Sequence, residues 1–136
     1  MKSALQITWL VAGRVWLLEA TGQITLPILK TYDEESLLRY KNGTYGRYFI
    51  ADVRQLQAFP TIRQCLGLTS LWHMHLHVFV IIGTQRHPLR VLFLALMHLV
   101  RLHYKEVMSL DEAKAYLLSI DSTLPPLEQW ASAETV

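Results

Sequence analysis

Strand-like and helix-like segments alternate along almost the whole chain, and this alternation restricts the fold more than any other feature. Residues 5–11 and 15–20 are rich in β-branched and aromatic side chains, and Ala12-Gly13-Arg14 joins them. Two such runs around a short glycine-containing link predict an antiparallel hairpin, which Gly22 closes. The chain therefore begins with two strands before its first helix.

The first helix is predicted to begin at Thr25, where a threonine precedes Pro27 and Asn42-Gly43 follows the last turn. Proline is favoured in the first helical turn, and glycine just after the last one. Thr31 is an alternative start, because Glu34 would complete a capping box with it.

The rest of the chain continues the alternation. In chain order, we expect a strand over 48–53, a short helix from Pro60-Thr61 to about 68, a buried strand over 74–82, a helix from Pro88 to about 104, a brief strand over 105–108, and a helix to about 120 capped by Ser109 with Glu112.

The resulting order, ββαβαβαβα, predicts an α/β fold: a mixed, mostly parallel sheet with helices on its faces and an antiparallel hairpin at one edge. A chain of 136 residues fits one domain. Pro125-Pro126 indicates its end, so we expect a domain over 1–124 and a tail over 125–136.

Composition narrows the class of protein. Hydrophobic residues make up 51% of the chain, which argues for a filled core, and the net charge of +2 comes from scattered residues, which argues against nucleic acid as a partner. Cys65 is the only cysteine, so no disulfide can form within the chain. The most apolar stretch, 91–100, is shorter than the roughly 20 residues of a membrane span. We expect a cytoplasmic protein.

Three short segments carry a family resemblance by their order and spacing. They are Gly22-Gln23-Ile24-Thr25 after the hairpin, Ile50-Ala51-Asp52-Val53 in the third strand, and Ser109-Leu110-Asp111-Glu112-Ala113 before the last helix. With the element order, they make residues 7–124 resemble the SpoIIAA-like branch of the STAS superfamily. The resemblance implies a non-enzymatic module that binds a protein partner and needs no cofactor. It also implies an alternative, because the same branch is similar to SEC14 proteins, which carry lipids.

The resemblance directs attention to the segment from Asp52 to Arg63. In anti-sigma-factor antagonists, a phosphorylatable serine, usually after an aspartate, lies where the third strand meets the second helix. Here Pro60 and Thr61 occupy those places, so Thr61 is a candidate for phosphorylation, with Arg54 and Arg63 as candidate anion partners. The competing interpretation is that Thr61 only caps a helix.

Three alternating histidines, His73, His75 and His77, would project from one face of a strand and offer three nitrogens to zinc. No further ligand lies at suitable spacing, so we predict no bound metal, and a metal-dependent enzyme ranks third among the functions. Cys65 falls within a predicted amphipathic helix, and no serine sits in a glycine-flanked elbow. We therefore predict no catalytic residues.

The third helix carries a second candidate surface. Arg90, Leu94, Met97 and Arg101 are spaced so that they share one stripe. Because arginine resists burial, we expect this stripe to face outward, with Leu94 and Met97 as apolar contacts for a protein partner or a second copy of the chain. Alternatively, a neighbouring helix, or the tail with Leu127 and Trp130, covers the stripe. An internal apolar cavity would instead favour the carrier of a lipid or other small apolar ligand.

Overall fold

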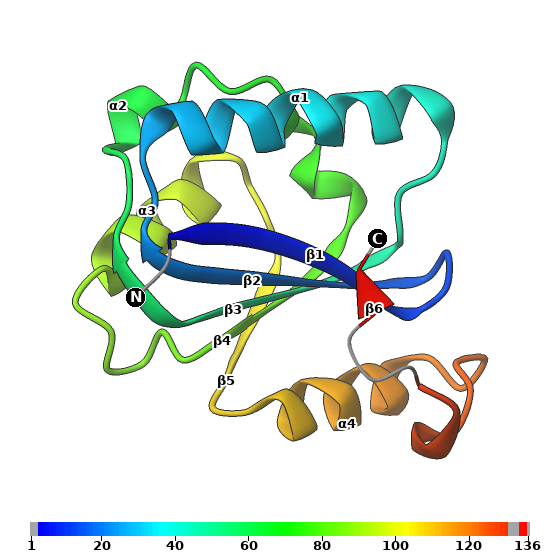
Figure 1. Ribbon diagram of the computed structural model, residues 1–136. Coiled ribbons are helices and arrows are strands. Elements are labelled where there is room, and N and C mark those ends of the chain that lie inside the picture. Colours follow the sequence, from blue (N-terminus) through cyan, green and yellow to red (C-terminus); the bar gives the residue numbers. More distant parts are fainter. Residues whose placement is uncertain (1–2, 131–133, 136) are drawn as a thin grey trace.

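The computed structural model describes residues 3–130 and 134–135, and its elements follow the predicted alternation (Figure 1). In chain order they are β1 (Ala4–Val11), β2 (Val15–Gln23), α1 (Leu26–Asn42), β3 (Tyr48–Ala58), α2 (Ile62–Cys65), the 3-10 helix η1 (Ser70–Leu76), β4 (Val78–Ile82), α3 (Arg90–Leu99), β5 (Tyr104–Val107), α4 (Leu110–Ile120), the 3-10 helix η2 (Leu127–Gln129) and β6 (Glu134–Thr135).

The strands form one mixed sheet in the order β5-β4-β3-β2-β1-β6. β1 and β2 pair as the predicted antiparallel hairpin, whereas β2, β3, β4 and β5 are parallel to one another. The two-residue strand β6 pairs antiparallel with β1. The α/β class, the mostly parallel sheet and the antiparallel hairpin are therefore confirmed.

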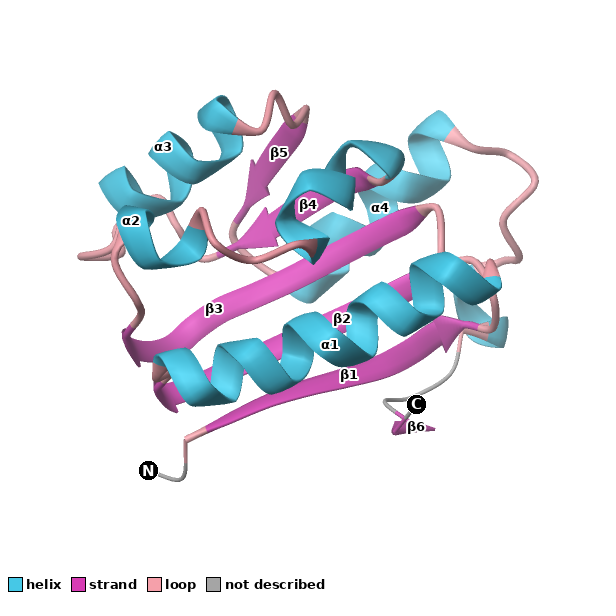
Figure 2. Cartoon of the chain, turned by 90° about the horizontal axis from the view of Figure 1, so that it is seen from above, coloured by secondary structure: helices cyan, strands magenta, loops and turns pink. Residues whose placement is uncertain are grey.

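Helices cover both faces of the sheet. α1 lies along the β1–β2 side of one face, here called the upper face, and α2, η1 and α3 cover its other side (Figures 1 and 2). α4 and residues 121–130 lie on the lower face. Among the described residues, no helix is both long and apolar enough to cross a membrane.

Side-chain alternation along β3 separates the interior into two cores, because successive residues of a strand point to opposite faces. Phe49 and Ala51 belong to the upper core, which they share with residues of α2 and α3. Tyr48 and Ile50 belong to the lower core, which α4 completes with Leu117.

α1 begins at the predicted cap, Thr25, and ends at Gly43, whose φ of 67° is left-handed. Glycine adopts that conformation without steric cost, and its N–H bonds back to the carbonyl of Tyr40. The alternative start at Thr31 is wrong, because α1 is already helical there.

The predicted strand over 74–82 is wrong in its first half. Residues 70–76 form η1, and the strand begins only at Val78. Asp33 of α1 explains this, because its carboxylate accepts hydrogen bonds from the N–H groups of Thr69 (3.2 Å) and Ser70 (2.6 Å) and so fixes the start of η1.

α3 is shorter than predicted and ends at Leu99. Arg101 has a left-handed φ of 55°, and the N–H of Leu102 bonds back to the carbonyl of Met97 at 2.9 Å. Glycine usually supplies this helix-ending geometry. Because an arginine adopts it here, the sequence contains no glycine to mark the end of α3.

The chain after residue 124 is packed rather than loose as far as Trp130. Trp130 is buried in the lower core, and its indole N–H donates to the carbonyl of Pro125 at 2.8 Å. The packed part of the chain thus extends past the predicted boundary at residue 124. Because Trp130 lies in the lower core, it does not cover α3, whose buried residues belong to the upper core.

Candidate functional site

The carboxyl ends of β3, β4 and β5 meet at one edge of the sheet, because these strands are parallel. Asp52 pairs with Ile82 across β3 and β4, and Glu106 pairs with Ile81 across β4 and β5. In open α/β sheets, ligands bind outside the carboxyl ends of the strands. The edge therefore contains Asp52 and Arg54 from the predicted Asp52–Arg63 segment.

Asp52 and Arg54 bind each other. The Arg54 guanidinium donates two hydrogen bonds to the Asp52 carboxylate, at 3.0 and 2.7 Å, because the two residues lie two apart on one strand. Gly83, with a φ of +86°, lies directly beneath Arg54, and a Cβ at this position would lie 2.3 Å from Arg54 Cγ. Arg54 is therefore held over the end of β4, already paired with a carboxylate.

Arg90 has a partner as well. Its guanidinium donates to both oxygens of Glu106, at 3.0 and 3.2 Å, and Thr84 donates to the same carboxylate at 2.7 Å. The hydrogen bonds from Arg90 hold the pKa of Glu106 below its usual range. This bidentate pair anchors the start of α3 to the end of β5.

Thr61 caps α2, as the competing interpretation predicted. Its hydroxyl accepts from the N–H of Gln64 at 3.3 Å, and its own N–H donates to the Gln64 side chain at 3.0 Å, which completes a capping box. Thr61 and Arg63 are exposed. Phosphorylation of Thr61 stays a prediction.

The predicted outward stripe of α3 is wrong in its apolar members. Met97 is buried, and Leu94 is half-buried against the upper core. The prediction assumed that the position of Arg90 faces outward. Instead, its long side chain reaches the partner Glu106 near the surface from a position on the same side as Met97. Arg101 is exposed, but it lies beyond the last turn of the helix.

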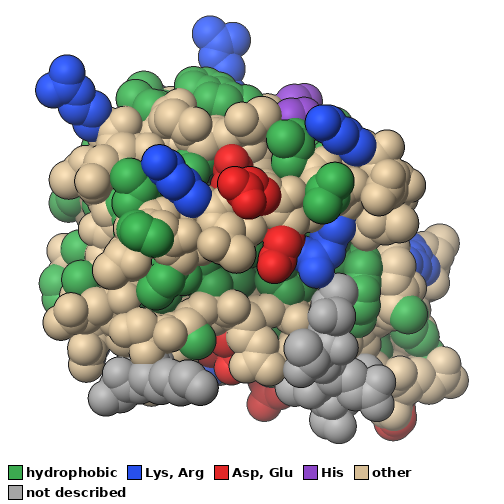
Figure 3. All heavy atoms as spheres, turned by 45° about the horizontal axis from the view of Figure 1, so that its top comes forward, with side chains coloured by type: hydrophobic (Ala, Val, Ile, Leu, Met, Phe, Trp, Pro, Cys, Tyr) green, Lys and Arg blue, Asp and Glu red, His purple; other side chains and the backbone are tan. Residues whose placement is uncertain are grey.

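The outer side of α3 instead carries Val91 and Leu99, whose exposed fractions are 80% and 50%. Leu66, directly after α2, is 37% exposed and follows a helix that contacts α3. We call Leu66, Val91 and Leu99 the outer apolar set. Figure 3 shows apolar side chains at several places over the helices of the upper face, with charged side chains between them.

The three alternating histidines do not share a strand face. His73 and His75 lie in η1, where each ring bonds to a backbone carbonyl of the same turn, and His77 follows it. Across the described part of the chain, no three histidine, cysteine or acidic side chains are grouped as metal ligands are. The geometry on which the metal alternative was based is therefore wrong.

His77 is a buried core residue instead. Its Nδ1 donates to the carbonyl of Gly46 at 2.6 Å, so Nε2 accepts from the Tyr40 hydroxyl at 2.7 Å. Its ring also packs against Trp16 and Phe49. Burial lowers the pKa of His77 to about 4, so the ring is neutral at pH 7.

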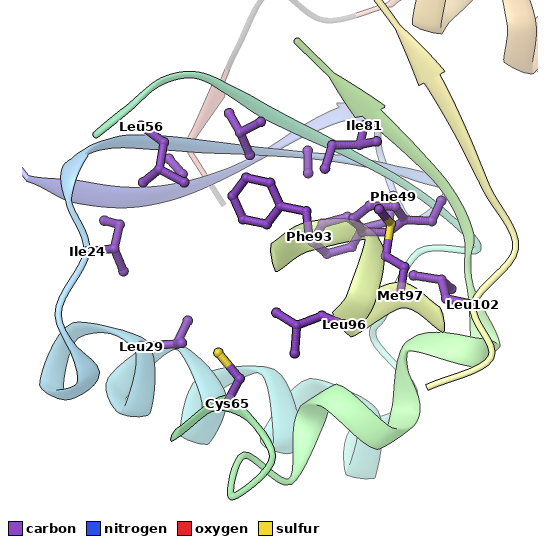
Figure 4. Close-up of a cluster of buried hydrophobic side chains, with 14 of the residues drawn as sticks. Ile24, Leu29, Phe49, Leu56, Cys65, Ile81, Phe93, Leu96, Met97 and Leu102 are labelled. Atoms are coloured by element: carbon purple, nitrogen blue, oxygen red, sulfur yellow. The ribbon is translucent and has the colours of Figure 1, made fainter. Parts of the chain in front are cut away.

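The upper core contains a partly open cavity of about 140 Å³ that the sequence did not predict. Its lining is apolar, aromatic or sulfur-containing, and it includes Leu29, Cys65, Phe93 and Leu96, which Figure 4 shows around the space between α1 and the sheet. A second cavity, of about 110 Å³, adjoins it and shares Phe93 and Leu96.

A signal for the cavity exists in the strands that form its floor. Ala20 of β2 and Ala51 of β3 are buried and point into the upper core, where larger residues would fill the space. Cys65 also lines the cavity, and burial raises the pKa of its thiol to about 11. Cys65 therefore acts as a small apolar side chain, as expected for a residue that is not a nucleophile.

Comparisons with known proteins agree with the predicted fold. No family model and no curated protein matches the chain. Among solved structures, the anti-sigma factor antagonist SpoIIAA in its unphosphorylated form is similar, with a TM-score of 0.58 and 10% identity over 85% of this chain and 98% of that one. A serine-to-glutamate variant of RsbS from Moorella thermoacetica is also similar, with a TM-score of 0.54 and 18% identity over 87% of this chain and 97% of that one. The chain has a SpoIIAA-like STAS fold.

Proposed function

We propose that this chain is a non-enzymatic regulatory module that binds a protein partner through the outer side of α2 and α3. The proposal is based chiefly on the outer apolar set. Val91 is 80% exposed in the first turn of α3, and Leu99 is exposed at the end of the same helix. Leu66 is exposed directly after α2, which contacts α3. Exposed apolar groups with a polar rim commonly mark interaction sites.

The fold adds support. SpoIIAA is an anti-sigma factor antagonist, so the same arrangement of strands and helices serves protein regulation elsewhere. Fold alone does not establish function; the exposure of Leu66, Val91 and Leu99 is what indicates this surface. A partner of this kind would place the working location in the cytoplasm.

The charges around the outer apolar set define the partner's chemistry. Arg63, three residues before Leu66, and Arg101, two residues after Leu99, are exposed. Arg54 and Arg90 instead already bind Asp52 and Glu106. A matching surface would present apolar side chains with carboxylates at its rim. Phosphorylation of Thr61 would add negative charge beside Arg63 and is part of this proposal as a regulatory step.

Affinity capture from the native host, with identification by mass spectrometry, tests the proposal. The three baits are the unaltered chain, Val91→Glu and, as matched control, Ile120→Glu, which changes an apolar residue that is 48% exposed on α4. We expect one protein to be retained by the unaltered chain and the control but lost with Val91→Glu, and to bind the purified chain directly. Identical sets of retained proteins for all three baits would refute the proposal.

Both variants should keep their stability within about 0.5 kcal/mol, because each changes an exposed side chain. Thermal unfolding of each bait therefore accompanies the capture. A loss of binding with unchanged unfolding assigns the effect to the surface.

A further inference from the structure

Protein binding at the outer apolar set does not explain the cavity in the upper core. Natural protein interiors are packed densely, with few voids larger than a water molecule. Here two adjoining cavities of about 140 and 110 Å³ lie beneath α1, α2 and α3. An unfilled space of this size forfeits contacts that a larger side chain at Ala20 or Ala51 would make.

The lining determines what the cavity can hold. Water needs two to four polar partners to occupy a cavity stably. The lining offers few, because its non-hydrocarbon side-chain groups are the Tyr32 hydroxyl, the Met74 thioether and the Cys65 thiol. The thiol already faces the carbonyl of Pro60. An apolar cavity of about 150 Å³ is known to stay dry and to bind benzene. The space is therefore suited to a small hydrocarbon group.

A route into the cavity lies between β1 and α1. Leu5 and Tyr32 line the cavity, and they also line a depression on the surface together with Ile28, Thr31 and Glu35. Movement of the Tyr32 and Leu5 side chains would join the two spaces. The polar groups at this mouth are the hydroxyls of Tyr32 and Thr31 and the Glu35 carboxylate, which would repel an anionic head group.

We propose that the upper cavity binds a small uncharged apolar molecule, of the size of an alkylbenzene or a medium-chain alcohol, which enters between Leu5 and Tyr32. Its hydrocarbon part occupies the space between Ala51 and Leu96, and a hydroxyl group, where present, remains near Tyr32. Fatty acids bind more weakly because the lining contains no cationic side chain and Glu35 stands at the mouth. This site is separate from the surface proposed for the protein partner.

Calorimetric titration with toluene, 1-octanol and octanoate at pH 8 tests the proposal. We expect saturable binding of toluene and 1-octanol, and at least tenfold weaker binding of octanoate. Ala51→Leu and Ala20→Leu should each weaken binding of toluene at least tenfold, because leucine occupies the space. Leu17→Met is the matched control: it changes the lower core on the same strand as Ala20, preserves side-chain volume, and should leave affinity unchanged.

The single cysteine supplies a second measurement that does not depend on the variants. Because Cys65 lines the cavity, a bound molecule should slow the reaction of its thiol with a disulfide reagent several-fold at saturating 1-octanol. Absence of saturable binding to the unaltered chain, binding that survives in both filled variants, or equal binding of octanoate and 1-octanol would each overturn the proposal. None of these results bears on the outer apolar set.

Discussion

The two faces of the sheet are packed differently although the same strands supply both. On the lower face, Leu117 of α4 and Val80 of β4 are completely buried in a core that Trp130 completes. On the upper face, α1, α2 and α3 stand over the strands with two apolar cavities between them. Protein interiors are generally packed tightly. We therefore expect the lower core to contribute more to the free energy of unfolding than the upper core, where the cavities leave contacts unmade.

Of all the changes, truncating a leucine in the lower core should give the largest effect, and the same truncation in the upper core should cost less. Leu117→Ala in the lower core should cost about 4 kcal/mol of unfolding free energy, because the side chain is fully buried and leaves a new cavity. Leu96→Ala should cost only about 2 kcal/mol, because Leu96 already borders unfilled space and loses fewer contacts. Urea unfolding measures both. Equal costs would remove the difference between the faces.

The faces should also respond to acid in different pH ranges. Burial lowers the pKa of His77 in the upper core from 6.5 to about 4, so the unfolded chain binds more protons between these values. Stability contributed by neutral His77 should therefore fall as the pH drops from 6.5 to 4, by about 3 kcal/mol in total. Unfolding measured at closely spaced pH values should show this slope, and His77→Gln should abolish it while exposed His103→Gln keeps it.

On the lower face, stability should be lost at a lower pH. Hydrogen bonds from Thr123 and from Tyr48 hold the pKa of Asp121 at about 2, below its usual 3.8. Stability from this carboxylate is present above pH 3.8 and is lost as the pH falls through 2. Asp121→Asn should therefore leave the pH dependence of the unfolding free energy between pH 6.5 and 4 unchanged. A change in that range would contradict its assignment to His77.

A smaller effect should come from the link between α1 and η1, which closes the upper face. Asp33→Ala removes the acceptor of the Thr69 and Ser70 N–H groups and should cost about 2 kcal/mol. It should also speed the reaction of the Cys65 thiol, because η1 is no longer held beside the cavity. Glu34→Ala, an exposed neighbour on the same helix, should change neither quantity; loss of stability in both variants would point to the helix rather than to the link.

The sequence predicts the fold well because its signals are local. Thr25 and Pro27 place the start of α1, and Ser109 places that of α4, since a cap and its helix lie within a few residues of each other. The errors come from partners far apart in the chain. Asp33 caps η1 from 36 and 37 positions away, and Glu106 binds Arg90 from another element.

The site was predicted less well than the fold for the same reason. Asp52, Arg54 and Arg90 do lie at one edge of the sheet, but each arginine already binds a carboxylate, and the apolar residues exposed on α3 are Val91 and Leu99 rather than Leu94 and Met97. The cavity depends on how far α1 and α3 stand from the strands, which no local pattern encodes. In the sequence, the small residues Ala20 and Ala51 at core positions of the strands are the signal for the cavity.

Enlarging one buried alanine on each face tests the difference between them most directly. Ala51→Leu extends into the upper cavity, whereas Ala113→Leu, in α4, must displace atoms of the filled lower core. We predict that urea unfolding will show a loss of about 2 kcal/mol for Ala113→Leu, and a change within about 0.5 kcal/mol or a gain for Ala51→Leu. A similar loss for both variants would show that the upper core has no space to fill, and would contradict the account.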